Sequence, residues 1–389
     1  MPRRKPQIYL FNWPTGLGGA DTKAEHLVRL LRDEFEWVVV PNAAERLRGA
    51  EGERAVAWLH GMGARAAVWE ELPKRLEGVG LCLCNTWWLA EGRALEAKQR
   101  GLRLVWGNEM MWHHTAELGA ISAGVLDAVT YVSPVQRAAL EPGYAAACGV
   151  PAAELPPPPL APLAADAPEA TALGHGRLGA LRWAMVGNWV DPEAFPWVDR
   201  SVGRRDAAVV VGRLSRPDPD KFPAGFPRTY ERLGLGSRHG TVRFRVMAWS
   251  EELARAFAPH RFDPRWDLLP ARAEGAAEYL SSLDLFVYEL GARFAESWGR
   301  STVEAMLTGA VPLISGGREG LRHHLRHLVP HGTGGFHCQG RRDFAAKARL
   351  LAEDPSLRQK MSREASAHAR ETLCDARRHR EVWRTLLLG

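Results

Sequence analysis

Short apolar segments that alternate with helical stretches run through almost the whole chain and limit the fold more than any other feature. The first half predicts strands at Gln7–Asn12, Trp37–Pro41, Ala55–His60, Leu81–Asn85, Leu102–Gly107 and Ala128–Val132. A second series predicts strands at Ala207–Gly212, Val242–Trp249, Leu283–Tyr288 and Val311–Ile314, and a helical region at Lys347–Leu388. Strands that alternate with helices pair in parallel sheets covered on both faces. The sequence therefore predicts an α/β protein with two doubly wound domains.

The length and one break in composition indicate where these domains end. A chain of 389 residues exceeds a single ordinary core. Pro151–Gly176 is rich in proline and alanine and predicts a surface excursion. We expect a first domain over residues 1–197 with an insertion at residues 151–180, a second domain over residues 198–370, and a C-terminal helix over residues 371–389 that packs back on the first domain.

Composition also limits location and ligand charge. No run of eighteen apolar residues and no cleavable leader pattern occur, which predicts a soluble cytoplasmic protein without a membrane-spanning segment. Residues 1–195 hold 19 Lys and Arg against 22 Asp and Glu, a charge of −3, which leaves 51 − 19 = 32 against 45 − 22 = 23, or +9, for residues 196–389. The second half is therefore the expected host of an anionic ligand.

Two glutamates separated by seven residues, Glu296 and Glu304, stand at the start of a predicted helix over Ser301–Leu307 that Gly309 ends. A helix start that follows a strand in an α/β sheet offers free N–H groups to phosphate. Carboxylates do not suit phosphate but do suit hydroxyls, so one ligand with hydroxyls at both ends of a diphosphate would satisfy both glutamates. Glu304 has the alternative role of complementing the helix dipole. The residues expected to line this cradle are Glu296, Ser297, Trp298, Gly299, Arg300, Ser301 and Glu304.

Two cations follow a strand that ends near Gly212. Arg213 and Lys221 lie eight positions apart, and arginine offers a planar fork to phosphate where lysine offers a point charge. Together they predict a clamp on a departing diphosphate. Asp218 and Asp220 spell a metal-nucleotide pattern, but their proline-rich context favours turn formation, and no metal site is predicted.

A glycine-rich segment, with Gly16, Gly18 and Gly19, follows the first strand and precedes a helix. The dinucleotide fingerprint requires glycine where Asp21 stands, so a dinucleotide site is poorly supported. Glycines at such a turn still permit close backbone approach to a ligand.

These motifs, in this order, resemble those of retaining glycosyltransferases of family 4, which have the GT-B fold. The resemblance also includes Tyr131–Gln136 and Gly187–Phe195 and covers nearly the whole chain. It implies two Rossmann-like domains facing across a cleft, with the nucleotide-sugar donor held by the second domain and the acceptor by the first. It further implies that Arg213 and Lys221 hold the diphosphate, Glu304 the ribose and Glu296 the transferred sugar, and that Gly18 and Gly19 close over the diphosphate.

The chain departs from the family pattern at Trp189, which replaces a glycine, and in the segment after the fifth strand, GNEMMWHH. The acceptor-side candidates in this segment are Asn108, Glu109, His113 and His114. The two histidines have the alternative role of forming the exposed start of a helix.

The resemblance implies hexosyl transfer with retention and without a metal, from a nucleoside-diphosphate sugar, most simply a UDP-sugar. A saccharide or small molecule is the favoured acceptor; a hydroxylated base in DNA and a lipid-linked acceptor are alternatives. An epimerase acting on nucleotide-sugars and a non-catalytic sugar-nucleotide-binding protein also remain open. The oligomeric state is not determined by the sequence.

Overall fold

The computed structural model describes residues 5–11, 19–151, 173–200, 208–233, 242–291, 294–315 and 325–389. Contacts divide the chain into two compact units. The first comprises the described parts of Met1–Ala161, Ala172–Trp189 and Asp375–Gly389, and the second lies within Val190–Cys374. In the part of the chain that is described, no helix has the length and apolar character needed to cross a bilayer.

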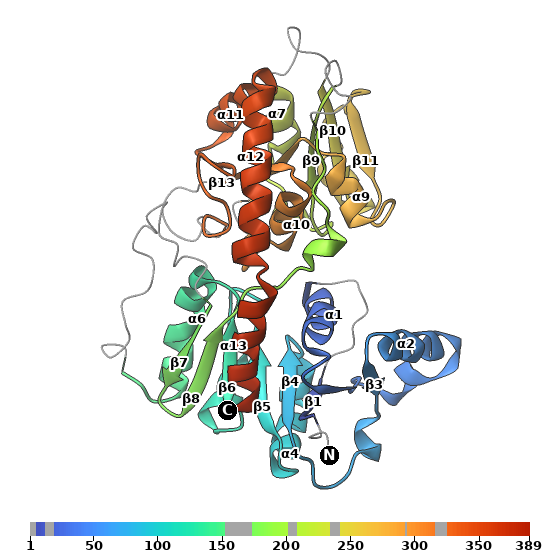
Figure 1. The fold of residues 1–389 in the computed structure, drawn as a ribbon, viewed down its shortest axis with the longest axis vertical. Coiled ribbons are helices and arrows are strands. Elements are labelled where there is room, and N and C mark those ends of the chain that lie inside the picture. Colours follow the sequence, from blue (N-terminus) through green and yellow to red (C-terminus); the bar gives the residue numbers. More distant parts are fainter. Residues whose placement is uncertain are drawn as a thin grey trace. The chain divides into compact units, whose positions relative to one another are not determined.

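The first unit is a helix-covered sheet (Figure 1). Its strands are β1 Gln7–Leu10, β2 Glu36–Val39, β3 Ala64–Ala66, β4 Val79–Leu83, β5 Arg103–Gly107, β6 Ala128–Tyr131, β7 Gly174–Leu178 and β8 Leu181–Met185. Its helices are α1 Gly19–Leu31, α2 Gly49–Gly61, α3 Thr86–Ala90, α4 Arg93–Gln99, α5 Thr115–Ser122, α6 Pro134–Ala147 and α13 Ala376–Leu388.

The strand order of this sheet is β3-β2-β1-β4-β5-β6-β8-β7. All neighbouring strands run parallel except β7 and β8, which are antiparallel. The chain builds outward in one direction from β1 and in the other from β4, so the order reverses between these two strands. Ligands of open α/β sheets bind beyond the carboxyl ends of the strands at such a switch point.

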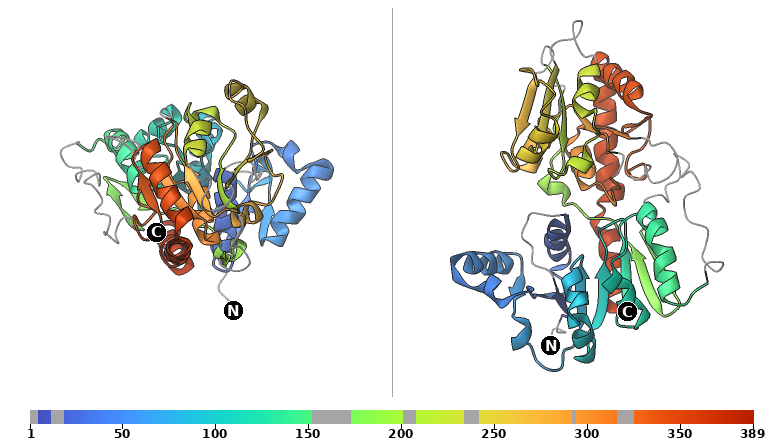
Figure 2. Two further views of the ribbon diagram at one scale, coloured as in Figure 1. Left: turned by 90° about the horizontal axis from the view of Figure 1, so that it is seen from above. Right: turned by 180° about the vertical axis from the view of Figure 1, so that it is seen from behind.

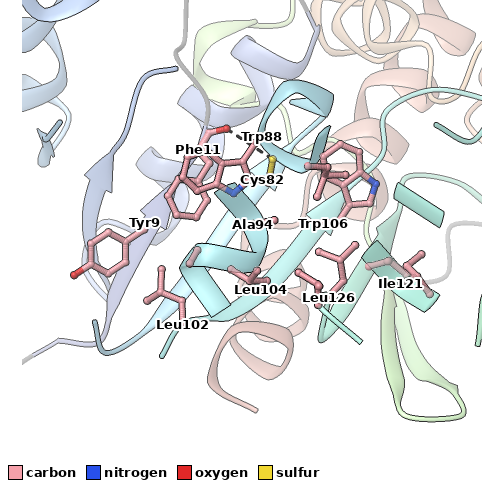
Figure 3. Packing of buried hydrophobic residues seen from close by; sticks show 14 of the residues in the cluster. Tyr9, Phe11, Cys82, Trp88, Ala94, Leu102, Leu104, Trp106, Ile121 and Leu126 are labelled. Carbon is pink, nitrogen blue, oxygen red and sulfur yellow. Dashed lines mark hydrogen bonds between the residues drawn. The ribbon is translucent and has the colours of Figure 1, made fainter. Parts of the chain in front are cut away.

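Each face of this sheet has its own apolar core, because side chains alternate between the faces along every strand. On one face Phe11 stacks on Trp88 with ring centroids 3.8 Å apart, and Trp106 belongs to the same apolar cluster (Figure 3). On the other face α1 and α13 cover the strands, and Trp383 of α13 is buried there. The last helix of the chain therefore completes the core of the first unit.

The second unit is a parallel sheet of six described strands in the order β11-β10-β9-β12-β13-β14 (Figure 2). The strands are β9 Val209–Leu214, β10 Val242–Met247, β11 Trp266–Leu269, β12 Leu285–Tyr288, β13 Val311–Ser315 and β14 Phe336–Cys338. The helices are α7 Phe226–Arg232, α8 Glu251–Ala256, α9 Ala276–Ser281, α10 Arg300–Thr308, α11 Arg341–Glu353 and α12 Pro355–His368, which continues as a π-helix over Ala369–Leu373. Its switch point lies between β9 and β12.

The fold confirms the predicted α/β class and corrects several elements. The predicted strand at Ala55–His60 is wrong, because these residues lie inside α2. Strands β3, β7, β11 and β14 were not predicted; they are short, and the β11 residues are only half-buried. Within the expected insertion at residues 151–180, Gly174–Leu178 forms the edge strand β7, while residues 152–172 lie outside the described residues. Ser133 caps α6, since its side chain accepts a hydrogen bond from Gln136 N–H.

A buried arginine caps two helices of the second unit. The guanidinium of Arg200 donates to the carbonyls of Leu280 and Ser281 at the end of α9, at 3.3 and 3.2 Å, and to that of Thr308 at the end of α10, at 2.8 Å. It also donates to Leu283 O at 2.6 Å. These bonds satisfy carbonyls that a helix end leaves without an intrahelical partner.

Replacing this arginine should destabilise the second unit. Arg200→Ala removes several charge-assisted hydrogen bonds at once, and we expect the free energy of unfolding to fall by about 3 kcal/mol or more, measured by chemical denaturation. Arg200→Lys should recover little, because one ammonium cannot reach both helix ends. The exposed Arg363 provides a control, since Arg363→Ala should change stability by only about 0.5 kcal/mol. Equal effects of Arg200→Ala and Arg363→Ala would contradict this assignment.

Candidate functional site

The carboxyl ends of β9 and β12 place the main candidate residues of the second unit at its switch point. Arg213 lies near the end of β9, and Lys221 ends a 3₁₀ turn over Pro219–Lys221. Glu296 lies in the loop between β12 and α10. Residues that are 75 to 83 positions apart in the sequence thus meet at one edge of the sheet.

The Arg213 side chain is fully buried. Its guanidinium donates hydrogen bonds to Glu289 O, to Lys221 O at 2.7 Å and to Ser215 Oγ at 3.4 Å. It also lies over the rings of Phe222 and Tyr288, with its central carbon 4.2 and 4.5 Å from the centroids. Arg213 therefore joins the 3₁₀ turn that carries Lys221 to the loop that follows β12. Its predicted contact with a diphosphate stays a prediction.

Lys221 and Glu296 form an ion pair. Lys221 Nζ lies 2.9 Å from Glu296 Oε2, and the Tyr288 hydroxyl donates to the same oxygen at 2.9 Å. Burial opposes the charge of Lys221, but Tyr288 and Glu296 outweigh it and raise the pKa of Lys221 above its usual value. Burial likewise opposes the charge of Glu296, yet Lys221 and the tyrosine hydroxyl hold its pKa below the usual value. Both groups are therefore charged at neutral pH.

The second oxygen of Glu296 is available to a ligand. Both hydrogen bonds to the carboxylate end on Oε2, and within the described residues Oε1 accepts none. The side chain is 14% exposed, so the carboxylate reaches solvent while its position is fixed. An ionised carboxylate with one free oxygen can accept hydrogen bonds from hydroxyl groups.

Glu304 lies one turn inside α10 and pairs with Arg300. Arg300 Nε donates to Glu304 Oε1 at 2.7 Å, and both side chains are largely buried, with exposures of 14% and 9%. Burial raises the pKa of Glu304 above its ordinary value of 4.5, and Arg300 only partly offsets this effect. Ionised Glu304 is therefore costly to the fold, a trait frequent among functional carboxylates.

A left-handed glycine starts α10. Gly299 has φ of +78°, and a Cβ there would lie 2.1 Å from a methyl of Leu325. The preceding Trp298 is buried and its ring lies 5.4 Å from that of His327. Ser297 precedes it in the loop, and Ser301 is partly buried in the first turn. The chain thus delivers backbone N–H groups at the helix start, close in sequence to Glu296.

The other residues expected on the donor side lie in different local settings, and their contact with a donor stays a prediction. Gly212 fits its strand closely, because a Cβ there would lie 2.7 Å from Arg245 O. Asp218 caps the 3₁₀ turn by accepting from Asp220 N–H at 3.0 Å, which confirms the predicted turn. Gly16 and Gly18 lie outside the described residues, and Gly19 is the first residue of α1. Gly309 ends α10 with φ of +87°, as predicted.

The four acceptor-side candidates of the first unit have different local environments. Asn108 is fully buried and its amide donates to the Glu117 carboxylate at 3.0 Å and to Trp112 O at 3.0 Å. His113 bonds to Leu140 O at 2.7 Å, and His114 stands at the start of α5, where its N–H donates to Glu117 at 3.0 Å. The side chains of Asn108 and His113 and the backbone of His114 therefore hold the segment after β5 in place.

Glu109, the fourth candidate, forms a buried ion pair with Lys23. Lys23 Nζ lies 2.6 Å from Glu109 Oε1, and the side chains are 3% and 9% exposed. The sequence analysis missed Lys23. It also missed Tyr288, whose hydroxyl donates to Glu296, and Arg216, whose positive charge acts on the Lys221–Glu296 pair. Of these three residues, only Arg216 could have been inferred from the sequence, because it stands five residues before Lys221. Among the described residues, no group of three or more His, Cys, Asp or Glu is arranged to hold a metal.

Solved structures that match nearly the whole chain include glycosyltransferases of the GT-B fold, and this chain, with its two parallel-sheet α/β units, has that fold. Anabaena HepE, solved with UDP-glucose, matches with a TM-score of 0.66 and 17% identity over 98% of this chain and 99% of that one. Sucrose-phosphate synthase from Thermosynechococcus elongatus matches at 0.65 and 12% identity, over 99% and 100%. A glycosyltransferase from Rickettsia africae matches at 0.66 and 10% identity, over 99% of each chain.

At these identities the likeness shows the fold alone. No family model matches the sequence, and no curated protein matches it.

The raised pKa of Glu304 makes a prediction about pH. The folded state holds this proton more tightly than the unfolded chain, so ionisation of Glu304 costs folding free energy. The cost is absent well below pH 4.5 and complete above the raised pKa. Glu304→Gln should therefore gain thermal stability relative to the wild type as the pH rises from about 4 to 7.

A calorimetric scan of both proteins at each pH measures this difference. Asp263→Asn is the control, because the pKa of that exposed carboxyl is lowered by Arg265, and its stability difference should run in the opposite direction. A difference between Glu304→Gln and wild type that does not change with pH would contradict the assignment.

Proposed function

We propose that this protein is a retaining glycosyltransferase that moves a hexosyl group from a UDP-sugar to an acceptor hydroxyl. The observation that carries the proposal is the Lys221–Glu296 pair beside the start of α10, at the switch point of the second unit of a GT-B fold. HepE, a structural neighbour, was solved with UDP-glucose. The motif resemblance to family 4 supports the same donor class.

In this proposal the donor lies over the switch point of the second unit. The N–H groups at the start of α10 and the ammonium of Lys221 face the diphosphate, where fixed positive charge favours an anion. Glu296 Oε1 accepts hydroxyls of the transferred sugar, and Glu304 those of the ribose. Arg213 holds the site in place by donating hydrogen bonds to the backbone carbonyls of Lys221 and Glu289.

The reaction breaks the bond between the anomeric carbon and the diphosphate oxygen. The acceptor oxygen forms its bond to that carbon on the same face, and the acceptor proton passes to the departing diphosphate. Negative charge grows on the leaving oxygen, and preorganised cations and helix N–H groups stabilise it without reorganisation. In this mechanism Lys221 and the helix start neutralise the leaving group and the reaction proceeds without a metal ion.

Loss of Lys221 should lower turnover more than donor affinity. Lys221→Met removes a charge that acts most strongly on the leaving diphosphate, so we expect kcat to fall by about 10²-fold. Release of UDP from a panel of UDP-sugars, with saccharide acceptors, measures the rate. Arg265→Gln, which removes an exposed cation paired with Asp263, is the control and should retain normal turnover. Normal turnover of Lys221→Met would reject the proposed role.

The stereochemistry and the metal requirement are tested together. We expect the product of the same reaction to keep the anomeric configuration of the donor in NMR spectra, and the rate to persist in excess EDTA, because Lys221 and the helix start supply the positive charge. An inverted product would reject retention, and a rate restored only by a divalent cation would reject the metal-free mechanism.

The same assays distinguish the alternative functions. Formation of free epimer without an acceptor would identify an epimerase, and UDP binding without any turnover would identify a sugar-nucleotide-binding protein.

A further inference from the structure

A buried hydroxyl of the second unit is fixed on the carboxylate of Glu296. It belongs to Tyr288, the last residue of β12, which is only 1% exposed. The hydroxyl donates to Glu296 Oε2 at 2.9 Å, and the same oxygen accepts from Lys221 Nζ. Burial raises the pKa of Tyr288 and the negative charge of Glu296 raises it further, so the phenol keeps its proton at neutral pH. The tyrosine is therefore a permanent donor to this oxygen.

The ring of Tyr288 is enclosed on several sides. It stacks on the ring of Phe286, its neighbour on the same face of β12, with centroids 5.6 Å apart and 15° between the planes. The guanidinium carbon of Arg213 lies 4.5 Å from its centroid, and its backbone lies opposite Ile314 of β13. These contacts fix the position of the hydroxyl, whereas a lysine ammonium ends a flexible four-carbon stem.

The two partners of Glu296 respond differently to an anion. The ammonium of Lys221 carries a full charge and three donors, so a diphosphate bound beside it competes with the carboxylate for this cation. A phenol has one donor, and that of Tyr288 already points at Oε2. Only the hydrogen bond from the tyrosine is therefore independent of the diphosphate.

The orientation of the carboxylate decides which oxygen meets a ligand. Because both hydrogen bonds end on Glu296 Oε2, Oε1 is left to accept from a hydroxyl. A binding group needs supporting residues that are themselves locked in place. Arg216 is the other cation whose charge acts on Glu296, but its side chain is exposed and does not fix an orientation. Tyr288 meets this requirement through its burial and its packing.

We propose that Tyr288 is a positioning residue of the donor site, whose hydroxyl holds Glu296 Oε2 and directs Oε1 to the transferred sugar while Lys221 faces the diphosphate. This inference rests on the proposed glycosyl transfer and adds to it the residue that fixes the sugar-binding carboxylate. Tyr288 itself touches neither substrate. It acts through Glu296, so its removal should affect the binding of the sugar and not that of the nucleotide.

The test compares a ligand that carries the transferred sugar with one that lacks it. Tyr288→Phe removes the hydroxyl and keeps the ring that packs on Phe286 and Arg213. Release of UDP from the UDP-sugar that the wild type turns over fastest gives kcat/KM, and calorimetry gives the Kd for UDP. We expect kcat/KM to fall by about tenfold or more, from loss of a hydrogen bond to a charged group, while the Kd for UDP stays within about twofold.

The pH dependence of kcat/KM is a readout that a purely structural role would not change. Burial raises the pKa of Glu296, but Lys221, the tyrosine hydroxyl and Arg216 together hold it below its usual value. Tyr288→Phe retains these two cations and also Arg213, which faces the tyrosine. Without the hydroxyl the pKa of Glu296 rises, and the carboxylate is protonated at a higher pH. The acid limb of the profile should therefore move to higher pH in the variant.

Two controls separate positioning from stability. Tyr230→Phe removes the hydroxyl of another fully buried tyrosine, which donates to Val287 O at 2.9 Å. It should lose about as much thermal stability as Tyr288→Phe but keep the wild-type kcat/KM and pH profile. In a Glu296→Ala background, Tyr288→Phe should lower kcat/KM no further, because a residue that acts through Glu296 has no effect once the carboxylate is gone.

Three results would overturn the inference and leave glycosyl transfer intact. The first is an unchanged kcat/KM and acid limb in Tyr288→Phe. The second is a loss of UDP affinity as large as the loss of kcat/KM, because the hydroxyl would then act on the nucleotide. The third is a further loss in the Glu296→Ala background, because the tyrosine would then act by another route. A wild type that releases UDP from no UDP-sugar would instead reject the proposed function, and this inference with it.

Discussion

The buried guanidinium of Arg213 is the interaction on which the second unit's site depends. A charge with no exposed surface is tolerated here because backbone carbonyls and two aromatic faces surround it. Those carbonyls belong to Lys221 and Glu289, so the same contacts that satisfy Arg213 bring the 3₁₀ turn against the loop after β12. The Lys221–Glu296 pair forms because this junction is fixed. Binding groups are thus positioned by a residue that need not itself meet the ligand.

The two units use the same physical solution at corresponding places. Each sheet reverses its strand order at one point, and at each point a lysine and a glutamate form a largely buried pair. The lysine precedes the glutamate in both pairs and comes from a segment that follows the strand on one side of the reversal. In each case the partner follows a strand on the other side. Each pair therefore joins segments that follow strands on the two sides of the reversal, at the place where open α/β sheets bind ligands.

The sequence predicted much of the fold, because alternating apolar runs record burial directly. It failed at Ala55–His60, where a short apolar run is compatible with strand or helix and the length of α2 decided. Glu296, Glu304 and Lys221 stand in local motifs, so the sequence could single them out as candidates, and their roles stay predictions. It could not find the Lys23–Glu109 contact, since 86 residues separate the partners. Nor could the sequence show that Arg213 is buried, because the identity of a residue at a strand end does not reveal whether its side chain lies in the core or at the surface.

The position of α13 in the chain has a consequence for synthesis. Trp383, Leu386 and Leu387 belong to the core that α1 builds on one face of the first sheet, yet they are among the last residues of the sequence. The described part of the second unit lies within Val190–Cys374 and is fully translated before them. A ribosome therefore delivers every described strand of the first sheet, together with α1, before α13, so the part of this apolar face that α13 covers is still exposed. That part of the face stays exposed to solvent until the whole second unit has been synthesised. Chaperone binding or aggregation is therefore favoured during this interval.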